Sequence, residues 1–232
     1  MPTRSTAAAR PRIPTIACIN QAKTPLGVDF DKLIRALQKY VDHHLAPVWG
    51  TPAKLVKATK PPRGAWVLMF IDSAEDVDKK HLKDFAYHLF KGQPMARVFV
   101  KSTIGNDEPI SLVASHELAE MLVNPDCNLW ALGRGNRLYS YEICDAVEEE
   151  EFKIDRLAMS DFVYPAYYEA HHKPGSVQFD HLKQITRPFQ LLAGGYALVR
   201  KGQKTKPISG SKAKQKRFLQ EDRRLHRTES MR

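Results

Sequence analysis

Short runs of apolar residues recur along the first hundred positions of the chain. Clear runs cover residues 14–20, 65–71 and 96–101, and a weaker alternating stretch covers 53–59. Unbroken apolar runs of this length are typical of strands that are buried on both faces. We therefore expect a mixed sheet of about four strands. Residues 74–91 show no clear period, and this stretch predicts a short helix or an irregular excursion.

Two segments show the spacing of helices. Residues 29–45 repeat apolar side chains at helical intervals, and Pro47 is expected to end this helix because proline lacks a backbone N–H. The polar stretch 106–109 is typical of a helix start. A second helix is therefore expected over residues 110–123, ending at the Asn-Pro pair 124–125.

The second half of the chain is less regular. Residues 138–200 are rich in aromatic side chains and predict short helices and loops, with 189–200 packing back on the body. These features favour one α/β (α+β) domain over residues 14–200, with an irregular C-terminal half. Residues 1–13 are expected to be a disordered leader, and residues 201–232 a basic disordered tail.

The charge of the chain is concentrated in that tail. The formal net charge is +10, and residues 201–232 contain 11 Lys and Arg against 3 acids. The tail therefore predicts either contact with nucleic-acid phosphates or a solubilising extension. Its single aromatic residue, Phe218, offers no platform for stacked bases.

Other compositional features restrict the location of the protein. No stretch of 18 apolar residues is present, so we expect no membrane span. The first 14 residues lack the apolar segment of a secretory signal. The three cysteines, Cys18, Cys127 and Cys144, are odd in number and widely spaced, which favours a reducing cytoplasm.

The expected helix 110–123 carries the candidate chemistry. It is apolar nearly all round, so it should be buried, yet it contains His116, Glu117 and Glu120. Buried carboxylates are costly unless they are paired or coordinated. His116 and Glu120 are four residues apart and share one face, where together they can bind one cation. Glu117 lies about 100° round the helix, so it can act as a general base on a nearby water without being a ligand.

The spacing is that of the His-Glu-x-x-His zinc helix with a glutamate in place of the second histidine. Zinc accepts carboxylate oxygen, although the added negative charge could shift the preference towards manganese, iron or calcium. The next acids along the chain are Glu142 and Asp145. We expect Glu142 to be the third ligand and Asp145 to hold the His116 ring, and the reverse assignment is almost as good.

Two segments of this chain resemble a group of uncharacterised bacterial and phage-associated proteins with a metalloprotease-like His-Glu-x-x-Glu helix. The segments are SHELAEMLVNPDCNLW (115–130) and YEICDAVE (141–148), and the same block is similar to one in plant exordium-like proteins. Weaker motifs extend the resemblance over about residues 14–200. It implies a zincin-like fold. One departure is Asn124, which stands where the group has aspartate before proline, so Asn124 or Asp126 would have to replace it.

The main hypothesis is thus a zinc-dependent, peptidase-like hydrolase in which His116, Glu120, Glu142 and Asp145 surround the metal and Glu117 is the catalytic base. A non-catalytic, metal-stabilised binding or structural protein, phage-related as the resemblance implies, is the first alternative. In that case the buried helix uses its ion only for stability. A nucleic-acid-associated protein acting through 201–232 is the second. The histidines at 171, 172 and 181 are weaker ligand candidates, since such residues are more often surface or loop residues.

Overall fold

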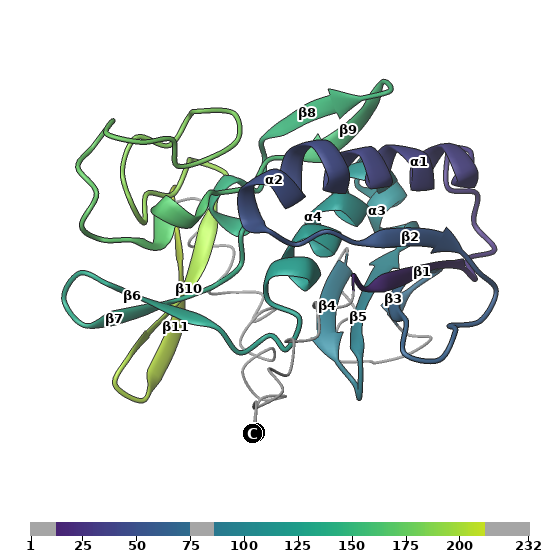
Figure 1. Cartoon of the computed structure of the whole chain (residues 1–232), viewed down its shortest axis with the longest axis horizontal. Coiled ribbons are helices and arrows are strands. Elements are labelled where there is room, and N and C mark those ends of the chain that lie inside the picture. Colours follow the sequence, from purple (N-terminus) through teal and green to yellow (C-terminus); the bar gives the residue numbers. More distant parts are fainter. Residues whose placement is uncertain (1–12, 75–85, 212–232) are drawn as a thin grey trace, which may run out of the picture.

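The computed structural model describes residues 13–74 and 86–211 of the chain. Two sheets lie on either side of a central buried helix, α4 (Ile110–Val123), as Figure 1 shows. A hairpin of two short strands packs against the same helix from a third side. Structure from both halves of the sequence thus surrounds α4, which places its side chains at the centre of the fold.

The first sheet confirms the expected mixed α/β architecture. Its strands are β1 (Thr15–Asn20), β2 (Lys54–Lys57), β3 (Trp66–Ile71), β4 (Ala86–Phe90) and β5 (Pro94–Phe99). They are arranged in the order β2-β1-β3-β5-β4, with β4 antiparallel to β5 and the other pairs parallel. The sheet therefore has one strand more than the four that the sequence predicted.

The additional strand is β4, and it corrects the prediction for residues 74–91. Residues 86–90 form neither a helix nor an irregular excursion, while 75–85 lie outside the described residues. The first three residues of β4 are all buried. A strand covered on both faces shows no alternation of apolar and polar residues, and one of five residues is too short to recognise from composition.

The first helix is longer than expected. It begins as α1 (Phe30–Tyr40), where the Asp29 side chain accepts a backbone N–H of the first turn at 2.7 Å. It continues through a π-helical turn (Val41–Leu45) into α2 (Ala46–Trp49). Pro47 therefore does not end the helix, contrary to the prediction. It falls in the first turn of α2, where a missing N–H is tolerated.

Helices α1 and α4 pack on the same face of the first sheet. Leu37 of α1 and Leu118 of α4 belong to one buried apolar cluster with Ile16 and Phe70 of the sheet. The bounds of α4 are those that the sequence predicted, and the short helix α3 (Val100–Gly105) precedes it. Burial of nearly the whole surface of α4 follows from its uniformly apolar sequence.

The C-terminal half is more regular than the sequence indicated. It forms a second, antiparallel sheet of β6 (Trp130–Gly133), β7 (Arg137–Ser140), β10 (Tyr196–Lys201) and β11 (Lys204–Ser209), in the order β11-β10-β7-β6. The expected return of residues 189–200 to the body is confirmed by the pairing of β10 with β7. Strands of four residues carry too little periodicity to distinguish them from loops.

Strand β11 also corrects the expected boundary of the basic tail. Residues 204–209 are not disordered, because they pair along their whole length with β10. The structure does not describe residues 1–12 and 212–232, so the predicted leader and the rest of the tail lie outside it. Within the described ranges, no helix is long and apolar enough to cross a membrane.

The hairpin beside α4 consists of β8 (Glu151–Ile154) and β9 (Leu157–Ser160). The hydroxyl of Ser115, on α4, accepts the backbone N–H of Ser160 at 2.8 Å. Two 3₁₀ turns, Asp145–Val147 and Pro165–Tyr168, flank the hairpin in sequence. The first of these turns brings an acidic side chain to the centre of the fold.

Candidate metal centre

Six ionisable side chains meet where α4, β4 and the segment after β7 come together. We call them the ionisable centre: His88, His116, Glu117, Glu120, Glu142 and Asp145. The His116 side chain is 13% exposed and the other five are between 0 and 7% exposed. Four carboxylates at this depth need compensation by cations or protons, since an isolated buried charge is strongly disfavoured.

The first group of ligand atoms surrounds one nitrogen of His116. Its Nε2 lies 3.3 Å from Oε1 of Glu120 and 3.4 Å from Oδ1 of Asp145. These separations exceed the usual 2.7–3.2 Å of an N–H···O hydrogen bond. They match the about 3.3–3.4 Å between neighbouring ligands of a tetrahedral ion bound at roughly 2.0–2.1 Å. These three residues form a group that could hold one small cation.

Neighbouring groups fix the two carboxylates of this first group. The backbone N–H of Cys144 donates to Oε1 of Glu120 at 3.2 Å. The hydroxyl of Tyr196, from β10, donates a short hydrogen bond to Oδ1 of Asp145. Partners of this kind orient ligating carboxylates in metal sites. The second sheet thus takes part in the centre through Tyr196, although it supplies no ligand of its own.

A second group of ligand atoms surrounds His88, on β4. Its Nε2 lies 3.4 Å from Oε2 of Glu142, and its Nδ1 lies 3.5 Å from Oε2 of Glu120. The ligand atoms of His88, Glu120 and Glu142 are all within 4.8 Å of one another, as are those of the first group. Glu120 belongs to both groups. It is fully buried and extends one oxygen towards each histidine.

Glu117 lies beside His88. Its Oε2 is 3.4 Å from Nδ1 of the His88 ring, and its side chain is 5% exposed. The rotation of about 100° between Glu117 and His116 along the helix keeps Glu117 out of the first group, as the sequence predicted. The geometry therefore leaves Glu117 adjacent to that group without making it a member.

Electrostatics within the centre favour cations. Burial by itself lowers the pKa of the His116 imidazole, but the carboxylates of Glu120 and Asp145 raise it well above its usual value. The pKa of His88 is likewise raised, because Glu142, the Cys127 thiol and Glu117 outweigh the effect of burial. The negative field that favours protons on these rings would equally favour a metal ion, which binds the neutral imidazole instead.

Cys144 lies close to the centre. Its thiol donates towards the backbone oxygen of His116 at a distance of 3.8 Å. Burial, followed by the charge of Glu120, raises the pKa of this thiol well above its usual value. Cys144 is thus a small buried side chain whose thiol contacts the backbone of α4.

The structure groups the predicted site residues differently from the preferred assignment, in which Glu142 was the third ligand beside His116 and Glu120. Asp145, rather than Glu142, stands beside His116 and Glu120, which favours the reverse assignment. Asp145 and Glu120 also face the same ring nitrogen, so Asp145 does not hold the opposite side of the ring. Glu142 joins His88. Sequence reasoning missed His88, because it lies in the strand that was not recognised.

Asn124 takes a structural role at the end of α4. Its Oδ1 accepts the backbone N–H groups of Asn128 and Leu129, each at 3.1 Å. An amide oxygen is sufficient for these two bonds, so this position does not require the aspartate of the resembling group. The expectation that Asn124 could replace it as a capping residue is consistent with this geometry.

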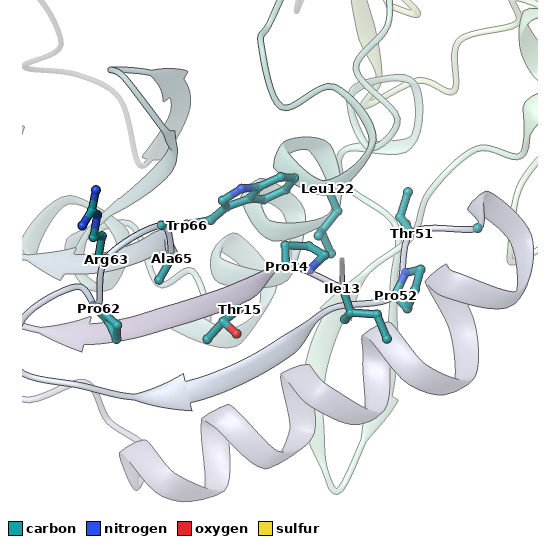
Figure 2. Close-up of a pocket in the computed structure, with 12 residues that line it drawn as sticks. Ile13, Pro14, Thr15, Thr51, Pro52, Pro62, Arg63, Ala65, Trp66 and Leu122 are labelled. Carbon is teal, nitrogen blue, oxygen red and sulfur yellow. The ribbon is translucent and has the colours of Figure 1, made fainter. Parts of the chain in front are cut away.

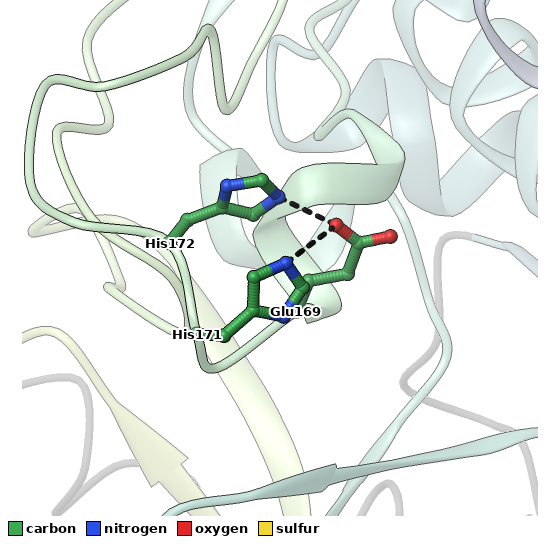
Figure 3. Close-up of side chains that lie close together, drawn as sticks. All are labelled: Glu169, His171 and His172. Atoms are coloured by element: carbon green, nitrogen blue, oxygen red, sulfur yellow. Dashed lines mark hydrogen bonds and ion pairs between the residues drawn. The ribbon is translucent and has the colours of Figure 1, made fainter.

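The remaining candidate histidines lie outside the centre. On the surface, Nε2 of His171 and of His172 face the same oxygen of Glu169, at 3.7 and 2.5 Å (Figure 3). His171 is 74% exposed, as is typical of a surface ion pair. His181 contacts His44 at 3.0 Å, and burial lowers the pKa of both rings.

A pocket of about 590 Å³ is also separate from the centre. It lies where β1 and β3 begin, and Figure 2 shows Pro14, Trp66 and Leu122 on its walls. The lining includes none of the six ionisable side chains. We therefore do not connect this pocket with the chemistry of α4.

In comparisons with known proteins, no family model, no curated protein and no solved structure matches this chain.

Proposed function

We propose that His116, Glu120 and Asp145 hold a divalent cation, with zinc as the first candidate, and that the chain is a peptidase-like metallohydrolase. The observation that carries this proposal is the close approach of Oε1 of Glu120 and Oδ1 of Asp145 to Nε2 of His116, at 3.3 and 3.4 Å. One imidazole and two carboxylates form an acceptable zinc ligand set. An oxygen-rich set also suits manganese or iron, so the identity of the ion is part of the test.

The fold supports the same assignment. A mixed sheet packed against a buried His-Glu-x-x-Glu helix is the architecture that the resemblance to zincin-like proteins implied. Within that architecture the most exposed of the six side chains is His116. Water and substrate would therefore reach the centre from the side of His116, and we place the reaction there. The free cysteines agree with a cytoplasmic location.

The catalytic step would depend on Glu117. A bound divalent ion supplies Lewis acidity to a carbonyl or water oxygen. Glu117 would take the proton of the attacking water and return it to the leaving amine. His88 holds Oε2 of this carboxylate at 3.4 Å and so keeps the base in position.

A non-catalytic metal centre is the second candidate, and the burial of the ligands favours it. Glu120 is 0% exposed and Asp145 is 3% exposed, which is typical of a closed structural site. In that case the ion would stabilise the fold by joining α4 to the segment after β7, and Glu117 would contribute only charge.

Metal analysis and one conservative variant separate these candidates. We expect the purified protein to retain a divalent ion that His116→Ala loses. Glu117→Gln should keep the ion but lose hydrolysis of a fluorogenic peptide library by about 100-fold or more, as for the removal of a general base. The exposed Glu151→Gln is the matched control. Absence of the ion from the wild type refutes both candidates. Metal retention with no peptide hydrolysis in the wild type refutes the hydrolase alone.

Association with nucleic acid through the basic segment is a third candidate. The β10–β11 hairpin displays three exposed lysines, Lys201, Lys204 and Lys206. Eight further Lys and Arg follow in residues 212–232. A basic hairpin followed by a basic segment would bind the phosphates of nucleic acid without recognising the base sequence. This activity would be independent of the ionisable centre.

A further inference from the structure

We infer that His88, Glu120 and Glu142 form a second divalent-cation site, which shares Glu120 with the first and makes the centre binuclear. The inference rests on the proposed function in one respect, since Glu120 must also serve the ion beside His116. It goes beyond that proposal by assigning a ligand on β4, outside the His-Glu-x-x-Glu helix and the acids that follow it.

The burial of His88 is the first observation. Its side chain is 1% exposed, and its Nε2 makes no hydrogen bond in the part of the chain that the structure describes. A buried polar atom of this kind is costly and calls for an explanation. Oε2 of Glu142 faces this nitrogen at 3.4 Å, the separation of two ligands of one ion rather than of a good hydrogen bond.

The second observation is the orientation of the His88 ring. Nδ1 makes a hydrogen bond of 3.4 Å with Oε2 of Glu117 and lies 3.5 Å from Oε2 of Glu120, whereas Nε2 faces Oε2 of Glu142. Histidine ligands usually donate their second ring N–H to a carboxylate, which fixes the tautomer and leaves the other nitrogen for the metal. With Nδ1–H towards Glu117, Nε2 of His88 is left for an ion shared with Glu142 and Glu120, since the ligand atoms of all three residues lie within 4.8 Å of one another.

The third observation is the position of Glu120 between the two groups. Its Oε1 is 3.3 Å from Nε2 of His116, and its Oε2 is 3.5 Å from Nδ1 of His88. A carboxylate that directs one oxygen to each side can bridge two ions. Ions bridged in two-metal hydrolases lie about 3.5–4 Å apart. A single shared glutamate on α4 is compatible with this separation.

The formal charge of the six side chains agrees with two ions. Glu117, Glu120, Glu142 and Asp145 carry four negative charges when ionised. Two protonated imidazoles would return only two positive charges. Two divalent cations with both imidazoles neutral would balance all four carboxylates, and a neutral set is the least costly to bury.

The competing explanation is a metal-free His88 that is protonated and held by the surrounding acids. Both explanations involve a buried ring among carboxylates, but they differ in metal stoichiometry. The surface group of Glu169, His171 and His172 in Figure 3 could bind an ion weakly and obscure the count. All measurements should therefore use a His171→Ala, His172→Ala background, whose fold is checked by circular dichroism, because His171 is exposed and His172 is partly buried.

The test is the number of Zn²⁺ ions bound per chain in that background, measured by mass spectrometry of dialysed protein and by calorimetric titration. We expect two ions in the parent. His88→Gln and Glu142→Gln should each retain one, His116→Gln should retain one, and Glu120→Gln should lose both. Two equivalents of Mn²⁺ should also give a spin-coupled electron paramagnetic resonance signal in the parent, which His88→Gln abolishes.

The outcomes separate the two proposals. One ion in the parent that persists in both His88→Gln and Glu142→Gln would overturn the second site and leave the first intact. No ion in the parent would overturn both sites. Because Glu142→Gln changes a single atom of the side chain, it keeps the test decisive if the His88 variant fails to fold by circular dichroism.

Discussion

The hydroxyl of Tyr196 donates a short hydrogen bond to Oδ1 of Asp145, and both side chains are buried. Tyr196 is on β10 and Asp145 is in the 3₁₀ turn after β7, 51 residues earlier. The bond connects the second sheet to the candidate metal centre. It makes the centre dependent on the correct docking of the C-terminal strands.

Removal of that hydroxyl should weaken metal binding. We expect Tyr196→Phe to lower Zn²⁺ affinity about 10–100-fold, as is usual when the partner of a ligand is lost. The measurement is a competition titration with a chromophoric chelator. Tyr164→Phe is the control, since its hydroxyl contacts His181 instead. Equal affinities for Tyr196→Phe and the wild type would show that Asp145 does not need this partner.

The backbone at Gly195 lies so close to its neighbours that adding one methyl group there should disturb the packing of the C-terminal strands on the candidate metal centre. A Cβ at Gly195 would lie 1.9 Å from the carbonyl oxygen of Ala146, the residue after Asp145. We expect Gly195→Ala to lower the free energy of unfolding by about 1–3 kcal/mol through overpacking. Urea denaturation measures it. Gly105→Ala, where nothing lies within 4 Å, should have little effect. A similar loss in both variants would contradict this explanation.

Two buried aspartates predict a dependence of stability on pH. Burial, together with the neighbouring Asp180, raises the pKa of Asp161 to about 8. The folded chain therefore binds this proton more tightly than the unfolded chain, whose aspartate pKa is about 3.9. The stabilising contribution is complete below about pH 4 and is lost as pH rises towards 8.

Asp161→Asn tests this prediction. The variant cannot ionise at that position, so its stability relative to the wild type should increase between pH 5 and pH 8, by about 1 kcal/mol or more, since one pKa unit corresponds to about 1.4 kcal/mol. Urea melts at the two pH values measure this change. A difference between the two proteins that is constant with pH would be evidence against a raised pKa.

The basic segment predicts salt-dependent retention of nucleic acid. Deletion of residues 212–232 removes 8 of the 11 Lys and Arg after position 200 and leaves the β10–β11 pairing intact. We expect the deletion to weaken binding to a random duplex and to flatten its dependence on salt concentration, because fewer counterions are released. Fluorescence anisotropy at several salt concentrations measures both effects. Metal content should not change, and unchanged DNA binding would assign the segment another role.

Much of the candidate site was predictable because helical periodicity is local. The apolar run 110–123 defined α4 with the bounds found in the structure. The interval of four residues between His116 and Glu120 then placed both on one face, and the position of Glu117 followed from the same geometry. The apolar runs of β1, β3 and β5 were recognisable for the same reason, since burial on both faces leaves an unbroken hydrophobic stretch.

The tertiary structure alone decided which acids and which second histidine meet this helix. Whether Asp145 or Glu142 approaches His116 depends on the path of the chain between β7 and the 3₁₀ turn, and that path carries no period. His88 reaches the centre only because β4 pairs antiparallel with β5 at the edge of the sheet. Contacts between residues distant in sequence depend on strand order and loop geometry, whereas a local pattern reports only the face on which a side chain lies.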